Sequence, residues 1–544
     1  MRLSSLLFAG KGLSLTSFFS LAYFAGFLPV CLILYSVMPK KGKKYFLLAA
    51  SYIFFWLISG KLLVYLILST FSMHYFGLWL DRMQNQMQEK LAVTEKEEKS
   101  AVKKNCISRQ RAVVILAVFL HIGILLTLKY SGFFAANVNT LLSYFHAPVQ
   151  LEIPKYLMPI GISFFTLQAL SYIFDVYHGV TKADENFFRL ALFIGFFPQI
   201  VEGPICRYHQ TADQLWNVKA IQYTNLSLGL QRILFGMMKK IVIADRLNPL
   251  VENVFSDYTE YDGGVIAIAA VCYTVQLYMD FSGSMDAVLG TAQIFGVGMP
   301  ENFKRPFFSR TISEFWMRWH ITLGTWFKDY VFYPITTVKA IKKLTSFARK
   351  RIGNHYGPLL GGSAALFCVW FCNGLWHGSA WNYIFFGMYH FALILGGNII
   401  SPLAKWINRK LHINPEWFGY RMVQILRTTA LVIIGELFFR AQGLSAGFHM
   451  FKSIVTRFSF SSLNDELLVK LGIDRMDLII VGVAMLIVFT VSIIKEKGIP
   501  VRETLAKKNV VVRWAVLYAL TIFIVVFGAY GFGYTPVDPL YAQF

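Results

Sequence analysis

The stretch that decides the class of this protein covers residues 17–37 and reads SFFSLAYFAGFLPVCLILYSV. It carries no charged residue over 21 positions, and about 20 apolar residues are enough for a helix to cross the hydrocarbon core of a bilayer. Four lysines follow between residues 40 and 44, without the small-residue cleavage site of a secretory signal. The segment is therefore predicted to remain in the protein as its first membrane-spanning helix.

The rest of the chain has the composition of a multi-pass membrane protein. Of its 544 residues, 56% are hydrophobic and 15% are charged, whereas soluble proteins carry about 25% charged residues. We expect an all-α polytopic membrane protein with about eleven spans and some short, re-entrant helices such as 187–201. After the first span, the apolar runs lie at 45–59, 62–80, 112–133, 156–174, 264–279, 364–376, 380–397, 428–439, 478–494 and 514–533.

The positions of the basic residues predict how the chain is oriented in the membrane. Loop 38–44 has four lysines, and loop 81–111, two crossings later, has eight basic and five acidic residues. Basic residues are concentrated in cytoplasmic loops, so both loops are predicted to be cytoplasmic and the N-terminus extracytoplasmic. Loop 81–111 is expected to be a solvated helix or a flexible linker. Basic cytoplasmic loops of a cell membrane protein therefore explain the net charge of +22. Nucleic acid is not expected as a partner.

No internal repeat is evident, so one membrane domain is predicted over residues 1–544. It would consist of N-terminal helices (1–154), a central core (155–400) and C-terminal helices (401–544). Polar side chains at membrane depth are costly unless they face the protein interior or a wet cavity. The core concentrates such residues, which predicts an internal site: Ser163, Gln168, Asp175, Gln199, Glu202, Arg207, Gln276, Asp280, Asp286, His320, Asn373 and His377.

A first candidate histidine belongs to the stretch Thr311-Ile-Ser-Glu-Phe-Trp-Met-Arg-Trp-His320. Thr311 and Glu314 have the spacing of a capping box, which predicts a helix that starts at Thr311. On that helix, Trp316 and His320 would share one face because they are four residues apart. The alternative interpretation is a structural histidine held in an aromatic cluster.

A second candidate, His377, ends an apolar segment in the stretch Asn373-Gly-Leu-Trp376-His377-Gly378. Glycine on either side permits a close backbone approach or a bend, so a substrate could reach the imidazole. In an apolar site the unprotonated ring is available as a general base. A histidine that only caps a helix end is the alternative.

Two further stretches place acids and amides beside apolar runs. Asp280 and Ser282 lie in Met279-Asp-Phe-Ser-Gly283, where the acid is expected to cap a helix or to pair with a buried base. Gln199, Glu202 and Arg207 follow Pro198, in a segment where two prolines and a glycine break the helix and where Glu202 could pair with Arg207.

The sequence predicts no metal site and no bound cofactor. None of the six cysteines forms a CxxC pair, and Gly-rich phosphate loops, GxSxG and HExxH are absent. A basic stretch over residues 339–351 could attract an acidic acyl donor, although the positive-inside bias alone also accounts for it.

Taken together, five stretches of the chain resemble the membrane-bound O-acyltransferase family. They are Met158–Gln168, Phe197–Pro204, Met279–Gly283, Phe315–His320 and Asn373–Gly378. The segments Glu436–Ala441 and Tyr541–Phe544 also look like those of the alginate O-acetyltransferase membrane subunits, which act in polysaccharide O-acetylation.

This resemblance implies a ring of helices around a central tunnel, with His377 as the catalytic histidine and His320 as a second one. The acyl donor would be a cytosolic thioester, acetyl-CoA or an acyl carrier, and acetyl would be the group transferred. The acceptor would be a hydroxyl of an extracytoplasmic polysaccharide, or a partner protein of the SGNH-hydrolase type. The candidates for lining the tunnel are Asn373, Trp376, Asp280, Ser282, Trp316, Gln199, Glu202 and Arg207.

Two alternatives remain at this stage. Polar groups at membrane depth also mark the path of a glycan or lipid in a transporter or flippase. Within the same family, a D-alanyl or lipid acyltransferase would carry the same motifs. A transporter needs no pair of histidines, so the effect of replacing His377 discriminates between transport and acyl transfer.

Overall fold

The computed structural model describes residue 20 and the ranges 22–154, 156–530 and 537. Every regular element among these residues is helical, and no strand occurs there. The all-α prediction is therefore confirmed. The chain divides into two compact units, the first formed by residues up to 230 with 288–300, the second by 231–287 with 301–544. The segment Tyr541–Phe544 and the start of the first predicted span lie outside the described residues.

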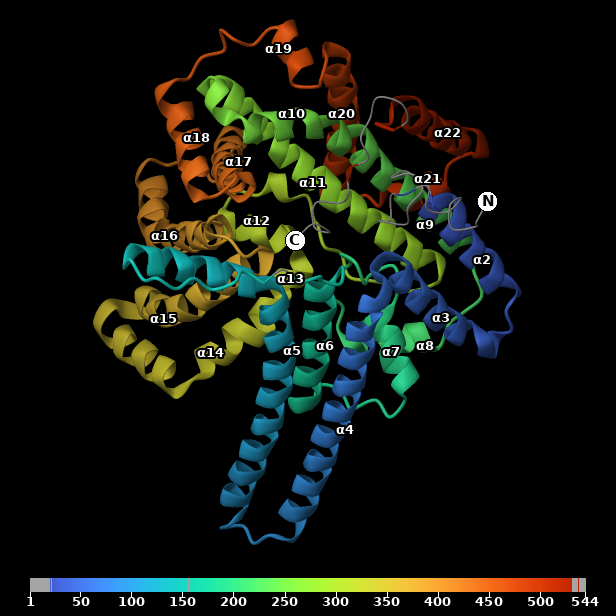
Figure 1. Cartoon of the computed structure of the whole chain (residues 1–544), viewed down its shortest axis with the longest axis vertical. Coiled ribbons are helices and arrows are strands. Elements are labelled where there is room, and N and C mark those ends of the chain that lie inside the picture. The colour runs from blue at the N-terminus through green and yellow to red at the C-terminus, as the bar shows by residue number, and fades with distance from the viewer. Residues whose placement is uncertain (1–19, 21, 155, 531–536, 538–544) are drawn as a thin grey trace. The chain divides into compact units, whose positions relative to one another are not determined.

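The first unit holds the N-terminal helices (Figure 1). Two of its helices, α9 (Tyr223–Met237) and α11 (Gly263–Ile294), are shared with the second unit. The other elements are η1 (Ala22–Phe27), α2 (Leu28–Val37), α3 (Lys40–Ser59), η2 (Gly60–Leu62), α4 (Leu63–Val93), α5 (Lys99–Tyr144), α6 (Ile162–Tyr177), α7 (Phe187–Gly195) and α8 (Tyr208–Trp216).

Helices α4 and α5 lie side by side as a long pair (Figure 1). The charged stretch 81–111 forms the tip of this pair, where both helices continue to a short connection at residues 94–98. Most of its side chains are exposed. Of the two expectations for this stretch, a solvated helix is the one that the structure shows.

The chain between α6 and α8 is broken, as the prolines and glycines in this region predict. Helix α7 is capped by the Asn186 side chain and ends at Gly195, and α8 starts at Tyr208 after a non-helical segment. Gly161, directly before α6, has φ +76°, and a Cβ atom there would lie 2.1 Å from the carbonyl oxygen of Ile200. Only glycine fits this contact, because it needs both the left-handed backbone and the missing side chain.

The second unit contains the C-terminal helices and the short elements around the candidate site. Besides its parts of α9 and α11, these are η3 (Met238–Ala244), α10 (Asp245–Ser256), η4 (Tyr258–Glu260), η5 (Pro306–Phe308), α12 (Ile312–Arg318), α13 (Ile321–Phe327), η6 (Lys328–Phe332), α14 (Tyr333–Thr337), α15 (Lys339–His377), α16 (Trp381–Lys410), α17 (Phe418–Arg440), α18 (Leu444–Thr456), α19 (Asp465–Lys470), α20 (Arg475–Glu496), α21 (Val501–Ala506) and α22 (Val510–Phe527).

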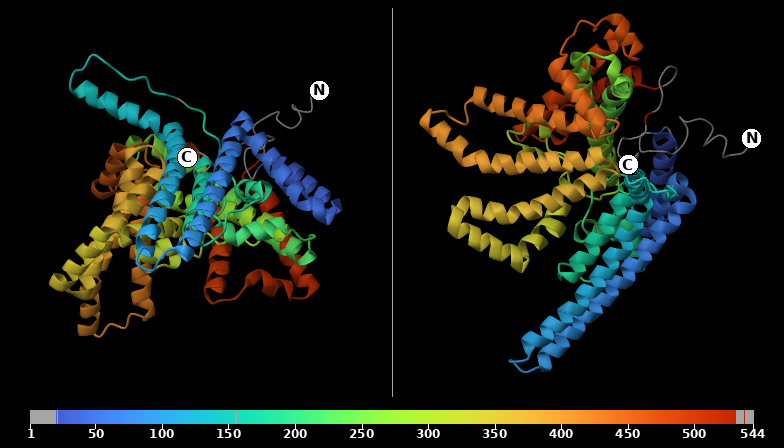
Figure 2. Two further views of the ribbon diagram at one scale, coloured as in Figure 1. Left: turned by 90° about the horizontal axis from the view of Figure 1, so that it is seen from below. Right: turned by 60° about the vertical axis from the view of Figure 1, so that its left-hand side comes forward.

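Helix α15 reverses its direction at Gly353, where φ is +82° (Figure 2). A Cβ on Gly361 would lie 1.9 Å from Oγ1 of Thr345, so the two halves pack against each other without room for a side chain. The basic stretch 339–351 forms the first half, and its lysines and arginines are exposed. The apolar second half leads directly to His377.

Eight segments of the described chain are long and apolar enough to cross a membrane. The expected number of eleven is not confirmed, for reasons that the helix lengths explain. Residues 45–59 lie in α3 and residues 62–80 almost entirely in α4. The two helices follow each other across η2 and count as one apolar segment, Lys40–Val93, whereas α6 has only 16 residues. The eight segments are Lys40–Val93, Lys99–Tyr144, Gly263–Ile294, Lys339–His377, Trp381–Lys410, Phe418–Arg440, Arg475–Glu496 and Val510–Phe527.

Candidate functional site

His377 is the last residue of α15 and is 3% exposed. Its ring lies among aromatic rings, with centroid distances of 5.1 Å to Phe439 and 6.0 Å to Phe386. The neighbouring glycines serve packing here. A Cβ on Gly374 would lie 2.5 Å from the carbonyl oxygen of Tyr383, and one on Gly378 would lie 2.2 Å from the Tyr383 ring. The space beside both glycines is thus filled by α16, and these contacts fix the end of α15.

His320 is also buried, at 2% exposure, but it is not part of the helix predicted for it. The predicted start is confirmed, because the hydroxyl of Thr311 accepts the backbone N–H of Glu314 at the beginning of α12. The helix ends at Arg318, and His320 follows with φ 45° and ψ 50°. The expectation that Trp316 and His320 share one face of one helix is therefore wrong.

A neighbouring chain segment explains this early end of α12. The carbonyl oxygen of Arg318 accepts a hydrogen bond from the N–H of Lys304, and the N–H of Ile321 donates to the carbonyl oxygen of Asn302. Backbone groups that leave a helix need partners elsewhere when they are buried. The segment around Asn302 supplies them.

Asn302 also determines which nitrogen of His320 carries the proton. Its side-chain oxygen accepts the backbone N–H of Thr322 at 3.0 Å, and since that N–H can only donate, the orientation of the carboxamide is fixed. The same oxygen lies 3.3 Å from Nδ1 of His320. Nδ1 must therefore donate, which leaves the lone pair of the neutral ring on Nε2. Burial lowers the pKa of His320 to about 3, so the ring is neutral at physiological pH.

The indole of Trp376 connects the two histidines. Its ring centroid lies 5.6 Å from that of His320 and 5.0 Å from that of His377. Trp376 therefore joins two histidines that are 57 positions apart in the sequence. The structure brings together three of the predicted site residues at this point.

A cavity of about 340 Å³ opens beside this cluster. His320, Asn373 and Trp316 line it, and the side-chain oxygen of Asn373 has no hydrogen-bond partner among the described residues. His377 is not one of the described residues that line the cavity. It lies one helical turn after Asn373 and hence on the same face of α15. A buried amide oxygen without a partner is expected to accept a hydrogen bond from a bound molecule.

Sequence reasoning missed Asn302 and also His390 on α16. His390 is fully buried, and its Nδ1 accepts the indole N–H of Trp316 at 3.2 Å. Its ring also packs against Phe386, which in turn contacts His377. The bond places Trp316 at the wall of the cavity. His390 stands in an apolar run, FGMYHFAL, in which no neighbouring motif singles it out.

Two of the predicted residues serve other contacts. Asp280 lies within α11 and does not cap it, and its carboxylate pairs with the buried ammonium of Lys240 at 2.9 Å. Of the two expectations for this acid, the pairing with a buried base is the one observed. Ser282 is buried one turn from Met285 and lines a second, larger cavity.

The remaining candidates, Gln199, Glu202 and Arg207, belong to the first unit. All three side chains are buried. The side-chain amide of Gln199 donates to the carbonyl oxygen of Phe193 at 2.6 Å, and the backbone N–H of Arg207 donates to Gln210. A pairing of Glu202 with Arg207, and a role for any of the three in a tunnel, stay predictions.

Comparison with known proteins bears on what this arrangement does. The profile of the membrane-bound O-acyltransferase family matches residues 180–349. The chain is 30% identical to the probable alginate O-acetylase AlgI of Azotobacter vinelandii, over 84% of this chain and 82% of that protein. It is 28% identical to a peptidoglycan O-acetyltransferase of Helicobacter pylori, over 64% and 65% of the two chains. A teichoic acid D-alanyltransferase of Bacillus subtilis is 30% identical over 52% of this chain and 68% of its own.

Proposed function

Because this chain belongs to the membrane-bound O-acyltransferase family and is a multi-pass membrane acyltransferase, we propose that the cluster around Trp376 is its acyl-transfer site. One observation carries this proposal, namely that His320 and His377 flank the same indole beside a cavity lined by Asn373, whose amide oxygen has no partner among the described residues. The proposed reaction moves an acetyl group from a cytosolic thioester to a hydroxyl of an extracytoplasmic glycan, or to a partner protein that acylates the glycan.

In this proposal, His377 is the general base. A hydroxyl is a poor nucleophile at neutral pH, so its proton must be removed as its oxygen attacks the thioester carbonyl. His377 accepts that proton, the new C–O bond forms, and the tetrahedral intermediate collapses with loss of the C–S bond. The imidazolium then returns the proton to the departing thiolate, so that free thiol and ester are produced and the base is regenerated.

His320 is assigned to positioning the acceptor. A donor to the developing oxyanion would need an N–H at Nε2, but the bond from Nδ1 to Asn302 leaves a lone pair there. Nε2 is therefore suited to accept a hydrogen bond from the acceptor hydroxyl. Asn373 carries an amide N–H₂ group beside the cavity, and this group is the better candidate for stabilising the oxyanion.

The relatives support a glycan as the acceptor and leave open which acyl group is transferred. Two of them are named for O-acetylation, of alginate and of peptidoglycan, and one for D-alanylation of teichoic acid. Acetyl is proposed because the alginate relatives cover the largest part of the chain. A thioester in the cytosol and an acceptor outside also explain why the enzyme is embedded in a membrane.

The test measures ester-linked acetate released by mild base from the surface polymers of a strain that lacks the gene. The strain is complemented at matched expression with wild type, His377→Ala or His355→Ala. His355 lies on the same helix but is exposed, so its replacement controls for changes in α15. We expect the wild type and His355→Ala to restore acetate, and His377→Ala to reduce the transfer rate by about 10²–10⁴.

Other outcomes of the same experiment would revise the proposal. Restoration of acetate by His377→Ala to within tenfold of wild type would remove His377 from catalysis. Release of D-alanine instead of acetate would keep the site and change the acyl group. A strain whose polymers show neither ester with any variant would point to an acceptor other than a surface glycan.

A further inference from the structure

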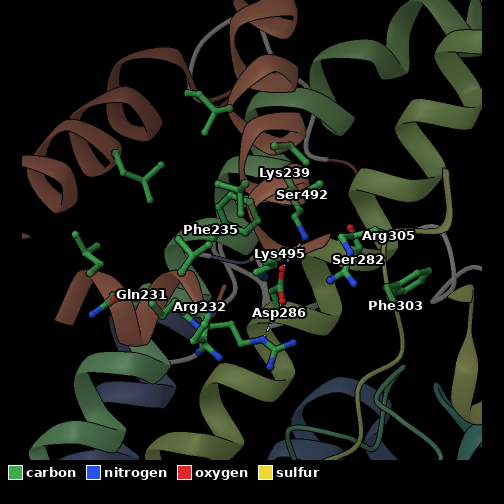
Figure 3. Close-up of a pocket in the computed structure, with 18 of the residues that line it drawn as sticks. Gln231, Arg232, Phe235, Lys239, Ser282, Asp286, Phe303, Arg305, Ser492 and Lys495 are labelled. Carbon is green, nitrogen blue, oxygen red and sulfur yellow. Dashed lines mark hydrogen bonds and ion pairs between the residues drawn. The ribbon is translucent and has the colours of Figure 1, made fainter. Parts of the chain in front are cut away.

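A second cavity of about 950 Å³ lies in the second unit between α20 and α22 (Figure 3). Its walls are residues on one side of each helix, and its floor comes from α9, η3 and α11. The wall of α20 consists of Val483, Ile487, Val488, Val491, Ser492 and Lys495, and that of α22 of Val516, Leu517, Ala519, Leu520 and Phe523. Asn302, which orients His320, also lines this cavity, whereas His320, Asn373 and His377 do not.

The described residues leave much of the two apolar walls uncovered, and Val483 and Val516, for example, are each 46% exposed. Both helices are candidate membrane spans, and only 6% of the most apolar window of α22 is buried within the protein. An apolar helix surface of this kind is covered by lipid in a bilayer. The cavity is therefore accessible to a molecule that arrives laterally from the membrane.

One end of the cavity is strongly basic. Six of its lining residues are basic and three are acidic, and Glu496 pairs with one of the six, Arg305, which leaves an excess of two positive charges. Asp286 is shared by Arg232 and Lys239, at 2.8 Å and 2.7 Å, and Glu301 pairs with the same Arg232 at 2.6 Å. Lys495, which is labelled in Figure 3, adds one more positive charge to this group, and Arg502, which also lines the cavity, adds another. Burial and then the nearby Arg232 lower the pKa of Arg502, as expected where positive charges gather.

The basic residues lie at one end of the cavity, and the apolar walls extend from there along α20 and α22, which is the arrangement of headgroup and acyl chains in a lipid. Lys495 lies at the last turn of α20, whereas Val483 lies 12 residues earlier and about 18 Å away along the axis. Between them the wall is almost entirely aliphatic. The connection between α20 and α22 carries further basic residues, including Lys497, Lys507 and Lys508. A basic pocket at a membrane interface between helices is suited to an anionic lipid headgroup.

We propose that this cavity binds an anionic phospholipid, with its phosphate among Arg232, Lys495 and Arg502 and its acyl chains between α20 and α22. The bound lipid completes the surface between α20 and α22, where the described protein leaves a gap. A phosphate-bearing soluble molecule would match the basic end but would leave the long aliphatic walls unfilled. In this proposal the lipid is neither the donor nor the acceptor of the acyl transfer proposed above.

The test uses the full-length protein purified in mild detergent. The double variant Lys495→Gln/Arg502→Gln removes two charges from the cavity, and Lys507→Gln/Lys508→Gln removes two from the same connection outside it. Binding of phosphatidylglycerol is measured by native mass spectrometry and by its effect on thermal unfolding. Phosphatidylcholine, inorganic phosphate and coenzyme A serve as comparison ligands.

We expect phosphatidylglycerol to bind and to raise the unfolding temperature of the wild type and of the control variant. At about 1 kcal/mol for each basic residue, the cavity variant should bind it about 30-fold more weakly. A third variant, Ala519→Trp, fills the cavity from an exposed position of α22 and keeps every charge, and it should also lose the lipid. This variant keeps the proposal testable if the charge variant does not fold.

Three results would overturn the proposal. Equal loss of phosphatidylglycerol in the control variant would mean that only the net charge of the connection matters. Equal binding of phosphatidylcholine would show that no anionic group is recognised. Stabilisation by inorganic phosphate or coenzyme A in the wild type, but not in the cavity variant, would assign the basic end to a soluble phosphate compound.

Discussion

His320 combines a rare backbone conformation with a fixed side chain. Its φ of 45° lies in the left-handed region, which costs most residues about 1 kcal/mol or more and which Asn, Asp and His occupy more often than others. Asn302 bonds to the imidazole Nδ1, and its carbonyl oxygen accepts the next backbone N–H, that of Ile321. The backbone and the imidazole are thus oriented by one residue.

This combination predicts different outcomes for three replacements of His320. His320→Asn tolerates the left-handed backbone and should unfold within about 2 °C of wild type while losing most transfer activity. His320→Ala should lose activity as well, and should be about 1 kcal/mol less stable than His320→Gly, because only glycine relieves the backbone. Thermal unfolding and acetate transfer, measured on the same preparations, separate the two effects. Full activity of His320→Asn would contradict a role for the imidazole.

A second prediction concerns the protonation of His320. In the wild type, burial lowers its pKa to about 3, so lowering the pH from 8 to 5 should not protonate Nε2. Asn302→Asp would place a carboxylate beside Nδ1, which stabilises the imidazolium and raises the pKa. Protonation then removes the Nε2 lone pair, and the acid limb of activity should move to higher pH.

The measurement is the pH profile of acyl transfer for wild type and Asn302→Asp, after unfolding temperatures have shown that both are folded. Asn302→Leu serves as the control, since it removes the bond without adding a charge. It should lower activity at every pH and leave the acid limb where it is. Identical acid limbs in wild type and Asn302→Asp would argue against His320 acting through Nε2.

At the scale of the elements, α17 packs tightly against side chains of α16 at Gly435. A Cβ there would lie 2.8 Å from Nε2 of His390 and 3.1 Å from the ring of Tyr389. His390 in turn holds Trp316 at the wall of the cavity. Trp316 of α12 can therefore keep its position only if residue 435 of α17 has no side chain.

We predict that Gly435→Ala destabilises the protein by about 1–3 kcal/mol, because a methyl group must displace a buried ring. The matched control is Gly482→Ala in α20, where a Cβ would meet no atom within 4 Å. The same change there should be neutral or stabilising by up to about 1 kcal/mol, since alanine favours a helix. Unfolding temperatures of both variants in one detergent check the prediction, and equal shifts would contradict it.

Sequence patterns predicted the ends of helices correctly where those ends depend only on residues close by in the chain. The cap at Thr311, the break after Gly195 and the end of the apolar run at His377 all follow from nearest neighbours in the sequence. The end of α12 at Arg318 does not, because its backbone partners come from residues 302 and 304. No pattern within residues 311–320 contains that information.

At the scale of the whole molecule, the basic tip of the α4–α5 pair predicts the membrane topology. The connection 94–98 should be cytoplasmic, and residues 145–161, at the other end of α5, extracytoplasmic. In a cysteine-free background, Glu97→Cys should react with a membrane-impermeant maleimide only after cells are permeabilised. Val149→Cys should react in intact cells. The opposite pattern would reverse the orientation of the chain.

The sequence predicted the class of the molecule more completely than the contents of its site. Composition and apolar runs suffice for an all-α membrane protein, because each span satisfies its own backbone. The site depends on contacts between distant segments, so His390 and Asn302 escaped notice and Asp280 was grouped with the histidines although it pairs with Lys240. The resemblance to known acyltransferases pointed to both histidines and to Trp376, and the structure showed that the indole lies against both imidazoles.

In images of single molecules in a detergent micelle, the orientation of each molecule should be recognisable from the α4–α5 pair. Helix α5 has 46 residues and is about 69 Å long, whereas the hydrocarbon core of a bilayer is only about 30 Å thick. The far end of the α4–α5 pair must therefore extend beyond the micelle as a paired rod. Here the charged tip itself serves as the fiducial.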